Sequence, residues 1–284
     1  MAVKFERVTD NAPWSIRGLH KAMAFNGRLL IYGGRHGATY LSDVWETGNG
    51  SDWTAISPDA GLGGLCSYGA AVHNRRLYIS NGLPDSEAEV VHSLDANLGK
   101  LDTINAGWPG RYDGEMCSYD EHLWMMGGEG ADMYNDVWKS RDGVQWARVL
   151  ANGHTQWTPR MDHRLVVHGG YMWIIGGVDD NGPCSDVWYS SNGYDWTQAI
   201  SVAPFGAIYD HGLVSYDRRL VVVTRECRLW HSLDGTLWVD GGLCEMPARG
   251  EFGLEVYDNR IYLLGGAGAQ VDYNDVWRTV GTEF

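Results

Sequence analysis

Short apolar runs separated by turn-forming residues recur along the whole chain, and one copy of the pattern is especially regular. It consists of an apolar run at 173–175, a glycine pair at 176–177, Asp-Val-Trp at 186–188, Asn-Gly at 192–193 and a tryptophan at 196. Apolar runs of this length, bounded by glycine and other turn residues, are typical of β-strands. The pattern therefore predicts an all-β protein built from many short strands.

Variants of this pattern fill the sequence as six units, two of which are irregular. In the second unit Glu-Val-Val at 89–91 replaces Asp-Val-Trp, and in the fifth unit Thr224 and Arg225 replace the glycine pair. Because no Pro/Ser-rich linker interrupts the repeat, we predict a single domain over 1–284. The predicted units cover approximately 14–57, 62–106, 108–151, 157–200, 204–242 and 246–284, and residues 3–9 complete the last unit.

Each unit holds runs for four strands, named a to d in chain order, and is predicted to form an antiparallel sheet. The Asn-Gly or Asp-Gly pair supplies the positive φ that a two-residue hairpin between strands c and d needs. One such sheet has two apolar faces and cannot bury both alone. Sheets stacked radially, with tryptophans between their faces, can do so.

The glycine pair that closes strand b, the Asp-Val-Trp that opens strand c and the tryptophan of strand d resemble the kelch repeat. The resemblance covers essentially the whole chain and is strong in four units. It implies a six-bladed β-propeller of four-stranded antiparallel blades, with strand a of each blade lining a central channel. Residues 5–8 (Phe-Glu-Arg-Val) are similar to 146–149 (Trp-Ala-Arg-Val), so the N-terminal segment is predicted to pair into the last blade and close the propeller.

The charge and the cysteines narrow the choice of partner and compartment. With 36 Asp and Glu against 22 Lys and Arg, the net charge is −14, and such a surface repels phosphate backbones and anionic bilayers. Nucleic acid and membrane are therefore not expected partners. The five cysteines form no CxxC pair and indicate free thiols in a reducing compartment. The N-terminus as given lacks an apolar signal stretch, so we expect a cytoplasmic protein or a component of a virion or other assembly, unless a signal was removed.

The start of strand a carries the most informative polar residues, because arginine occupies the same position in four units. The resemblance places this position where the channel opens on the face of the d–a and b–c loops, which kelch proteins that bind ligands commonly use. Four guanidiniums at this mouth could grip a carboxylate or sulfate. Alternatively, the arginines of units three, four and six pair with the Asp or Glu two residues further on, and these ion pairs tie neighbouring blades together. The predicted ligand-binding residues are Arg17, Arg111, Arg160, Arg249, Asp113, Glu251 and Tyr68.

A second hypothesis is acid–base chemistry at the same mouth. The alternative is that the same side chains are packed and have a structural role. Its candidate catalytic residues are His20, His163, His211, Asp162 and Asp210. The sequence contains none of the spacings of zinc sites, serine-hydrolase elbows or phosphate-binding loops, so we expect no metal and no cofactor. The b–c loops carry aromatic and acidic residues that suit sugar rings or are merely solvated.

From these features we expect a recognition or assembly module without enzymatic activity. It would bind a protein segment or glycan through the arginine-rimmed mouth and the b–c loops, for example within a virion or surface appendage. One alternative is an enzyme on an acidic sugar, resembling the kelch-type sialic acid mutarotases. The other is a purely structural propeller, whose mouth is closed by its own side chains.

Overall fold

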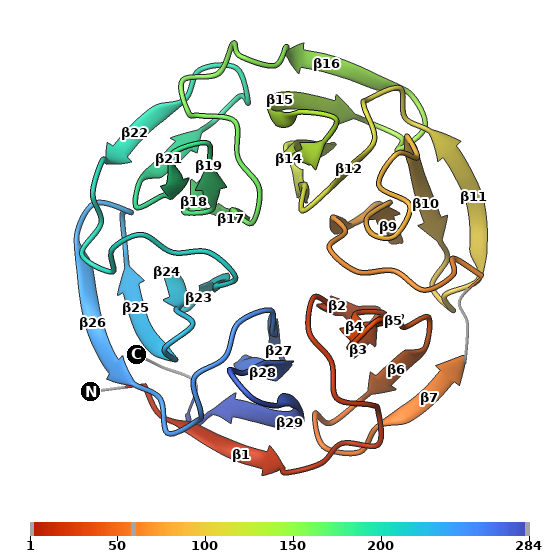
Figure 1. Ribbon diagram of the computed structural model, residues 1–284, viewed down its shortest axis with the longest axis vertical. Coiled ribbons are helices and arrows are strands. Elements are labelled where there is room, and N and C mark those ends of the chain that lie inside the picture. The colour runs from red at the N-terminus through yellow and green to blue at the C-terminus, as the bar shows by residue number, and fades with distance from the viewer. Residues whose placement is uncertain (1–2, 58–60, 282–284) are drawn as a thin grey trace. The chain divides into compact units, whose positions relative to one another are not determined.

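The computed structural model describes residues 3–57 and 61–281, and in these ranges all regular structure is β-strand. The strands form six antiparallel sheets of four main strands, one for each predicted unit (Figure 1). The predicted fold class, an all-β six-bladed propeller, is confirmed. The sheets divide between two compact units, Met1–Cys66 with Asp210–Phe284 and Ser67–Tyr209, which are described separately. That the whole chain acts as one domain stays a prediction.

The first unit contains blades 1, 5 and 6, and the inner strands of blades 5 and 1 both lie next to that of blade 6. Blade 1 consists of β2 (Lys21–Phe25), β3 (Arg28–Tyr32), β6 (Val44–Thr47) and β7 (Thr54–Ser57), with a hairpin of β4 (Arg35–His36) and β5 (Thr39–Tyr40). Blade 5 consists of β23 (Gly212–Tyr216), β24 (Arg219–Val223), β25 (Arg228–Ser232) and β26 (Trp238–Leu243). Blade 6 consists of β27 (Gly253–Tyr257), β28 (Arg260–Ala267), β29 (Asp272–Thr279) and β1 (Phe5–Thr9).

The second unit contains blades 2, 3 and 4, and the inner strands of blades 2 and 4 both lie next to that of blade 3. Blade 2 consists of β8 (Ala70–His73), β9 (Arg76–Ser80), β10 (Val90–Leu94) and β11 (Lys100–Asn105). Blade 3 consists of β13 (Glu115–Tyr119), β14 (His122–Gly130), β15 (Met133–Ser140) and β16 (Trp146–Leu150), and β12 (Arg111–Tyr112) pairs with the end of β14. Blade 4 consists of β17 (Arg164–His168), β18 (Tyr171–Ile175), β21 (Val187–Ser190) and β22 (Thr197–Ile200), with a hairpin of β19 (Val178–Asp179) and β20 (Gly182–Pro183).

In blades 3 and 6, strand b is the most deeply buried strand because neighbouring blades of the same unit lie on both sides of it. In β14 and in β28, four consecutive apolar side chains are buried. Successive side chains of a strand point to opposite faces, so double burial produces a continuous apolar run instead of an alternating one. This is the physical origin of the apolar runs in the sequence.

Tryptophans fill the spaces between neighbouring blades within each unit. Trp108, which precedes blade 3, lies edge to face with Trp146 of β16 at 4.4 Å between ring centroids. Trp14 and Trp53 form the same arrangement at 4.4 Å in blade 1. Each ring buries on the order of 200 Å², so these residues supply a large part of the packing energy between sheets.

The N-terminal strand completes blade 6, as predicted. β1 pairs antiparallel with β29, with Phe5 opposite Thr279, and Figure 1 shows the red β1 beside the blue β29. Glu6 accepts a hydrogen bond from Nε of Arg278 at 2.7 Å. Phe5 is buried in the same apolar cluster as Trp277, where it fills the position that tryptophan holds in other blades. Pairing of the outermost strand leaves β29 without an open edge on that side.

The turns between strands c and d differ from the two-residue hairpins that were predicted. In blade 1 the loop 48–53 stands in place of a two-residue hairpin. Side-chain oxygens of Thr47 and Asn49 accept hydrogen bonds from backbone N–H groups within this loop at 2.8 to 2.9 Å. Such side-chain bonds offer the backbone an alternative to a tight hairpin. The positive φ is confirmed, since Gly50 has a φ of 76°. A side chain at Gly50 would also collide with the ring of Tyr262 in blade 6.

Candidate functional site

The segment before strand a pairs with the end of strand b in blades 1, 3, 4 and 6. In blade 3 this pairing is the short strand β12 against β14. In the other blades it consists of single bridges, Gly18 with Arg35, Met161 with Val178 and Gly250 with Ala267. The pairing brings the d–a and b–c loops to the same end of each of these blades, and this end carries the predicted site residues.

The four arginines of the predicted site are buried in their own blades. The Arg111 guanidinium donates through Nη1 and Nη2 to the two carboxylate oxygens of Asp136 at 2.6 and 3.0 Å. Nη1 also donates to the carbonyl of Gly127 at 2.8 Å, and Nε donates to that of Pro109 at 3.1 Å. The same contacts join Arg17 to Asp43, Arg160 to Asp186 and Arg249 to Asp275. All four arginines are at most 2 % exposed.

Each of these aspartates is the first residue of an Asp-Val-Trp motif, and its carboxylate also binds the tryptophan of the motif. Asp136 Oδ2 accepts a hydrogen bond from Nε1 of Trp138 at 2.7 Å. Burial opposes the ionisation of Asp43, but hydrogen bonds and charge from Arg17 hold its pKa below the usual value. The Arg17–Asp43 pair is therefore ionised. In all four pairs the guanidinium and the carboxylate are hydrogen-bonded to each other, as a stable buried ion pair requires. This Arg–Asp–Trp triad explains why the three residue types recur together.

The triads correct the ion-pair partner that the sequence suggested. The expected partner was the acidic residue two positions after the arginine, for example Asp113 after Arg111, and the pair was expected to join two blades. The observed partner lies 25 or 26 residues further along and belongs to the same blade. A ligand-binding role for the four arginines stays a prediction, but their side chains lie inside the blades and not at an open rim.

The predicted acidic residues occupy a special backbone position. The residue two after the arginine, or after its substitute, has a φ between 50° and 58° in all six blades. These residues are Leu19, Ser67, Asp113, Asp162, Asp210 and Glu251. Their backbone groups link successive blades within a unit, because Leu19 N–H donates to Glu251 at 2.9 Å and Asp113 N–H donates to Ser67 at 2.7 Å. The left-handed conformation costs an L-residue about 1 kcal/mol, so these interblade bonds hold a strained connection in place.

The predicted histidines and Tyr68 are also buried. His20, His163 and His211 are all less than 5 % exposed. Burial, together with the charge of Arg17, lowers the pKa of His20 to about 3. His20 is therefore neutral at physiological pH, as expected for a packed histidine. Its Nε2 lies 3.0 Å from the position that a Cβ on Gly253 would take, so the glycine makes room for the ring.

Two tyrosines of the b–c loops pack on the buried arginines. The ring of Tyr134 lies 4.4 Å from the guanidinium of Arg111, and the ring of Tyr273 lies 3.7 Å from that of Arg249. These are cation–π contacts inside the blade. One face of each of these rings, which the sequence suggested as platforms for sugars, thus packs within the protein.

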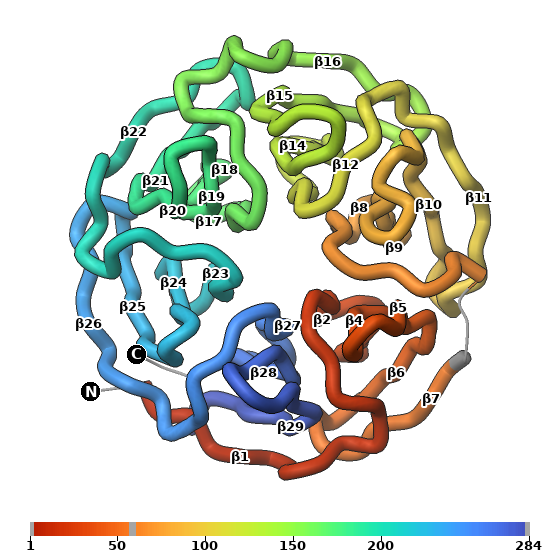
Figure 2. The backbone as a smooth tube through the Cα atoms, viewed as in Figure 1, coloured from red at the N-terminus to blue at the C-terminus, as the bar shows by residue number. Residues whose placement is uncertain are grey.

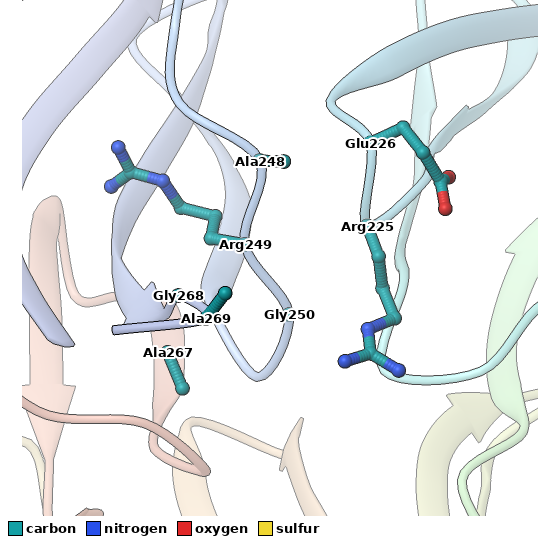
Figure 3. A pocket seen from close by; sticks show the side chains of 8 residues that line it. All are labelled: Arg225, Glu226, Ala248, Arg249, Gly250, Ala267, Gly268 and Ala269. Atoms are coloured by element: carbon teal, nitrogen blue, oxygen red, sulfur yellow. The ribbon is translucent and has the colours of Figure 1, made fainter. Parts of the chain in front are cut away.

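An open pocket of the first unit lies at the same end of blades 5 and 6. It has a volume of about 240 Å³ and is lined by Arg225, Glu226, Ala248, Arg249, Gly250, Ala267, Gly268 and Ala269. Figure 3 shows that the Arg225 side chain descends along one wall, whereas the Arg249 guanidinium turns away into blade 6. Sequence reasoning placed none of Arg225, Glu226 and the alanines in the site. The available signal was the replacement of the glycine pair by Thr224 and Arg225 in the fifth unit.

Neither a metal-binding cluster nor a membrane-spanning helix is found in residues 3–57 and 61–281. Among these residues no three His, Cys, Asp or Glu side chains form a group that could hold a metal ion. Within the same ranges there is no helix of the length and apolar character needed to cross a membrane. The five cysteines are buried thiols outside any disulfide, as the sequence suggested. Burial raises the pKa of Cys244 to about 12 and that of Cys184 to about 11, so these thiols are poor nucleophiles.

Four-stranded antiparallel blades with a glycine pair after strand b and a buried Arg–Asp–Trp triad are features of a β-propeller built from repeated units. The family model described as the Kelch motif matches residues 159–189. The chain is also similar to the leucine-zipper-like transcriptional regulator 1 homolog of Drosophila melanogaster, with 25% identity over 166 residues. The similar stretch makes up 57% of this chain but 13% of that relative, so the likeness concerns only a small part of the larger protein.

Proposed function

We propose that the protein is a recognition module that binds a segment of another protein through its b–c connections. The observation that carries the proposal is where the polar side chains and the b–c connections lie in each regular blade. Arginines, histidines and aspartates that could bind or react are engaged in the interior, whereas the b–c connections extend beyond the sheets as hairpins with exposed side chains. Figure 2 marks two of these hairpins, β4–β5 and β19–β20.

The b–c hairpins are suited to recognition because a rigid sheet holds each of them. The tip between β28 and β29 exposes Val271 to 57%, and that between β19 and β20 exposes Asp180 and Asn181. Variable loops on a rigid scaffold are a common site of protein binding. The coarse function, a protein-interaction module, also fits the kelch motif.

A protein segment is a better-supported ligand than a glycan. The ring of Tyr134 is buried against a guanidinium and is not available as a stacking platform for a sugar, and the guanidinium of Arg249 covers one face of the Tyr273 ring. A place in a larger assembly, such as a virion or surface appendage, would use the same hairpins and is included in the proposal. The mutarotase-like alternative requires a proton-transferring residue, and a neutral, buried His20 gives it little support.

The experiment compares proteins that co-purify with the wild-type chain and with two single variants. Val271→Asp places a charge on the tip of a b–c hairpin, and Val144→Asp does the same at a c–d turn, where the valine is 42% exposed. We expect Val271→Asp to lose bound proteins that Val144→Asp retains. Equal retention by both variants, or loss only in Val144→Asp, would contradict the proposal. Mutarotation of N-acetylneuraminate that is lost in His163→Ala would support the enzyme instead.

A further inference from the structure

Two of the five cysteines lie opposite each other at one end of blade 5. The last ladder pair of β25 and β26 at this end is Arg228 with Leu243. Cys227 directly precedes this pair on one strand, and Cys244 directly follows it on the other. The Cys244 N–H donates to the carbonyl of Cys227 at 2.8 Å. The two cysteines therefore form the next opposite pair, directly beyond the strands.

The side chains of this pair share one buried space. Opposite residues of an antiparallel sheet point their side chains to the same face. Both cysteines belong to the same apolar cluster, in which Cys227 is 0% and Cys244 is 9% exposed. Burial and, after it, the neighbouring Cys227 thiol raise the pKa of Cys244 to about 12. The two thiols are thus close enough to influence each other.

The same backbone bond occurs in other blades, where it joins different residues. In blades 2, 4 and 6 it links the two equivalent positions at 2.8 to 2.9 Å. The residues at these positions are Ala106 with Glu89, Ala203 with Ser185 and Ala12 with Asn274. The position of Cys244 thus holds alanine in three blades, and that of Cys227 holds a polar residue. Both positions change to cysteine in blade 5, and only this change puts two sulfur atoms side by side.

The backbone geometry of the pair is suited to a disulfide bond. Opposite residues in an antiparallel sheet have Cα atoms about 4.5–5.5 Å apart, and a disulfide accepts about 4.4–6.8 Å. The Cβ atoms of a disulfide lie about 1 Å closer together than those of most opposite pairs, so a small movement closes the bond. This movement falls at the turn 224–227, outside the paired part of the two strands.

We propose that Cys227 and Cys244 form a disulfide bond with each other when the chain equilibrates with a small disulfide oxidant such as oxidised glutathione. One cysteine thiolate attacks a sulfur of the oxidant, which gives a mixed disulfide and releases one glutathione thiolate. The second cysteine thiolate attacks the protein sulfur of the mixed disulfide and releases the second glutathione. Each glutathione thiolate takes up one of the two cysteine protons. Two protein thiols are thus oxidised while one glutathione disulfide is reduced.

The fold decides where this equilibrium lies, and burial decides how fast it is reached. Burial raises the pKa of both thiols, so thiolate is rare in the folded chain and exchange is slow. The bond would tie the b–c turn of blade 5 to the connection that leads from Cys244 into blade 6. It would also constrain the unfolded chain, so the oxidised protein should unfold at a higher urea concentration than the reduced protein. This inference goes beyond the proposed function and does not depend on it.

Peptide mapping of the full chain tests the bond directly. The protein is incubated in glutathione buffers of increasing oxidised fraction until the products no longer change, and free thiols are then alkylated. Trypsin cleaves after Arg228, so a disulfide holds together two peptides that otherwise separate. We expect Cys227 and Cys244 to be linked and the remaining cysteines, Cys66, Cys117 and Cys184, to be alkylated. In concentrated urea the same link should require at least about tenfold more oxidised glutathione, because the unfolded chain does not hold the thiols opposite each other.

Three variants decide whether the bond has the expected effect on stability. Cys244→Ala and Cys227→Ser each remove one sulfur and introduce a residue that an equivalent position holds in another blade, as in Ala203 and Ser185. Cys184→Ser, in blade 4, is the matched control because it removes a buried thiol outside the pair. The urea midpoint should be higher in oxidising than in reducing buffer for the wild type and for Cys184→Ser. It should be the same in both buffers for the other two variants.

Several outcomes would overturn the assignment. Alkylation of both Cys227 and Cys244 in every glutathione buffer would refute the bond. Links of equal yield to Cys66, Cys117 or Cys184, or a link that forms at the same glutathione ratio in urea, would show that the fold does not direct the pairing. A midpoint that still rises on oxidation in Cys244→Ala would assign the effect to other thiols.

Discussion

The Asp136→Asn variant tests the interpretation of the buried arginines as scaffold. In the wild type, the Asp136 carboxylate accepts hydrogen bonds from Nη1 and Nη2 of Arg111 at 2.6 and 3.0 Å and from Trp138 at 2.7 Å. Asparagine keeps one acceptor oxygen, turns an N–H₂ group toward another donor and leaves a buried guanidinium without its counter-charge. Removing one partner of a buried ion pair costs about 3–5 kcal/mol. We therefore expect the free energy of unfolding to fall by about this amount.

Urea unfolding followed by tryptophan fluorescence measures the effect, with an expected drop in midpoint of about 1 M or more at an unchanged slope. The control is Arg141→Gln, because the Arg141–Glu121 pair is exposed on both sides, and an exposed pair contributes about 0–1 kcal/mol. The double variant Arg111→Met/Asp136→Leu removes both charges and should recover part of the loss. A cost below 1 kcal/mol for Asp136→Asn, or a double variant no more stable than the single one, would refute the scaffold role.

Three further predictions concern the packing and the pH dependence of the first and second units. Trp108→Ala should lower the free energy of unfolding in urea by about 3–5 kcal/mol, because it empties the space beside Trp146. The control Leu237→Ala, at an exposed side chain, should change it by less than about 0.5 kcal/mol. Equal effects would argue against tryptophan packing between blades. Burial raises the pKa of Glu255 to about 7, above its value in the unfolded chain. Between about pH 4.5 and 7 the folded state therefore keeps a proton that the unfolded state loses, and the free energy of unfolding falls as the pH rises. Glu255→Gln should flatten this part of the stability–pH curve, and an unchanged curve would refute the protonated carboxyl. Deletion of residues 1–9 should speed amide exchange in β29, because that strand loses its partner, and unchanged protection would show that β1 does not hold the blade.

The regular features of the fold could be predicted from the sequence because they repeat. Strand b produces a continuous apolar run in every blade, and in the regular blades the glycine pair and Asp-Val-Trp mark the two ends of the b–c connection. The completion of blade 6 by residues 5–9 followed from the similarity of Phe-Glu-Arg-Val to a regular strand d. The length of the c–d turns was wrong, because the sequence does not reveal that Thr47 and Asn49 bind the backbone within the turn.

The candidate site was predictable only in part, because its chemistry depends on distances across the fold. The sequence singled out Arg111, but its partner Asp136 lies 25 residues away, and nearness in sequence favoured Asp113 instead. The pocket was missed because it arises where the b–c connection of blade 5, residues 224–227, is shorter than in the regular blades. The fifth unit looked degenerate in sequence, yet its departure from the repeat exposes Arg225.

The most direct test of the central claim, recognition by the b–c connections, is amide exchange of the full chain with and without a co-purified binding protein. The account predicts slower exchange at 178–183 and 267–272 in the complex, with no change in the outer strands β11 and β16. Protection confined to the outer strands, with the b–c connections unaffected, would contradict it.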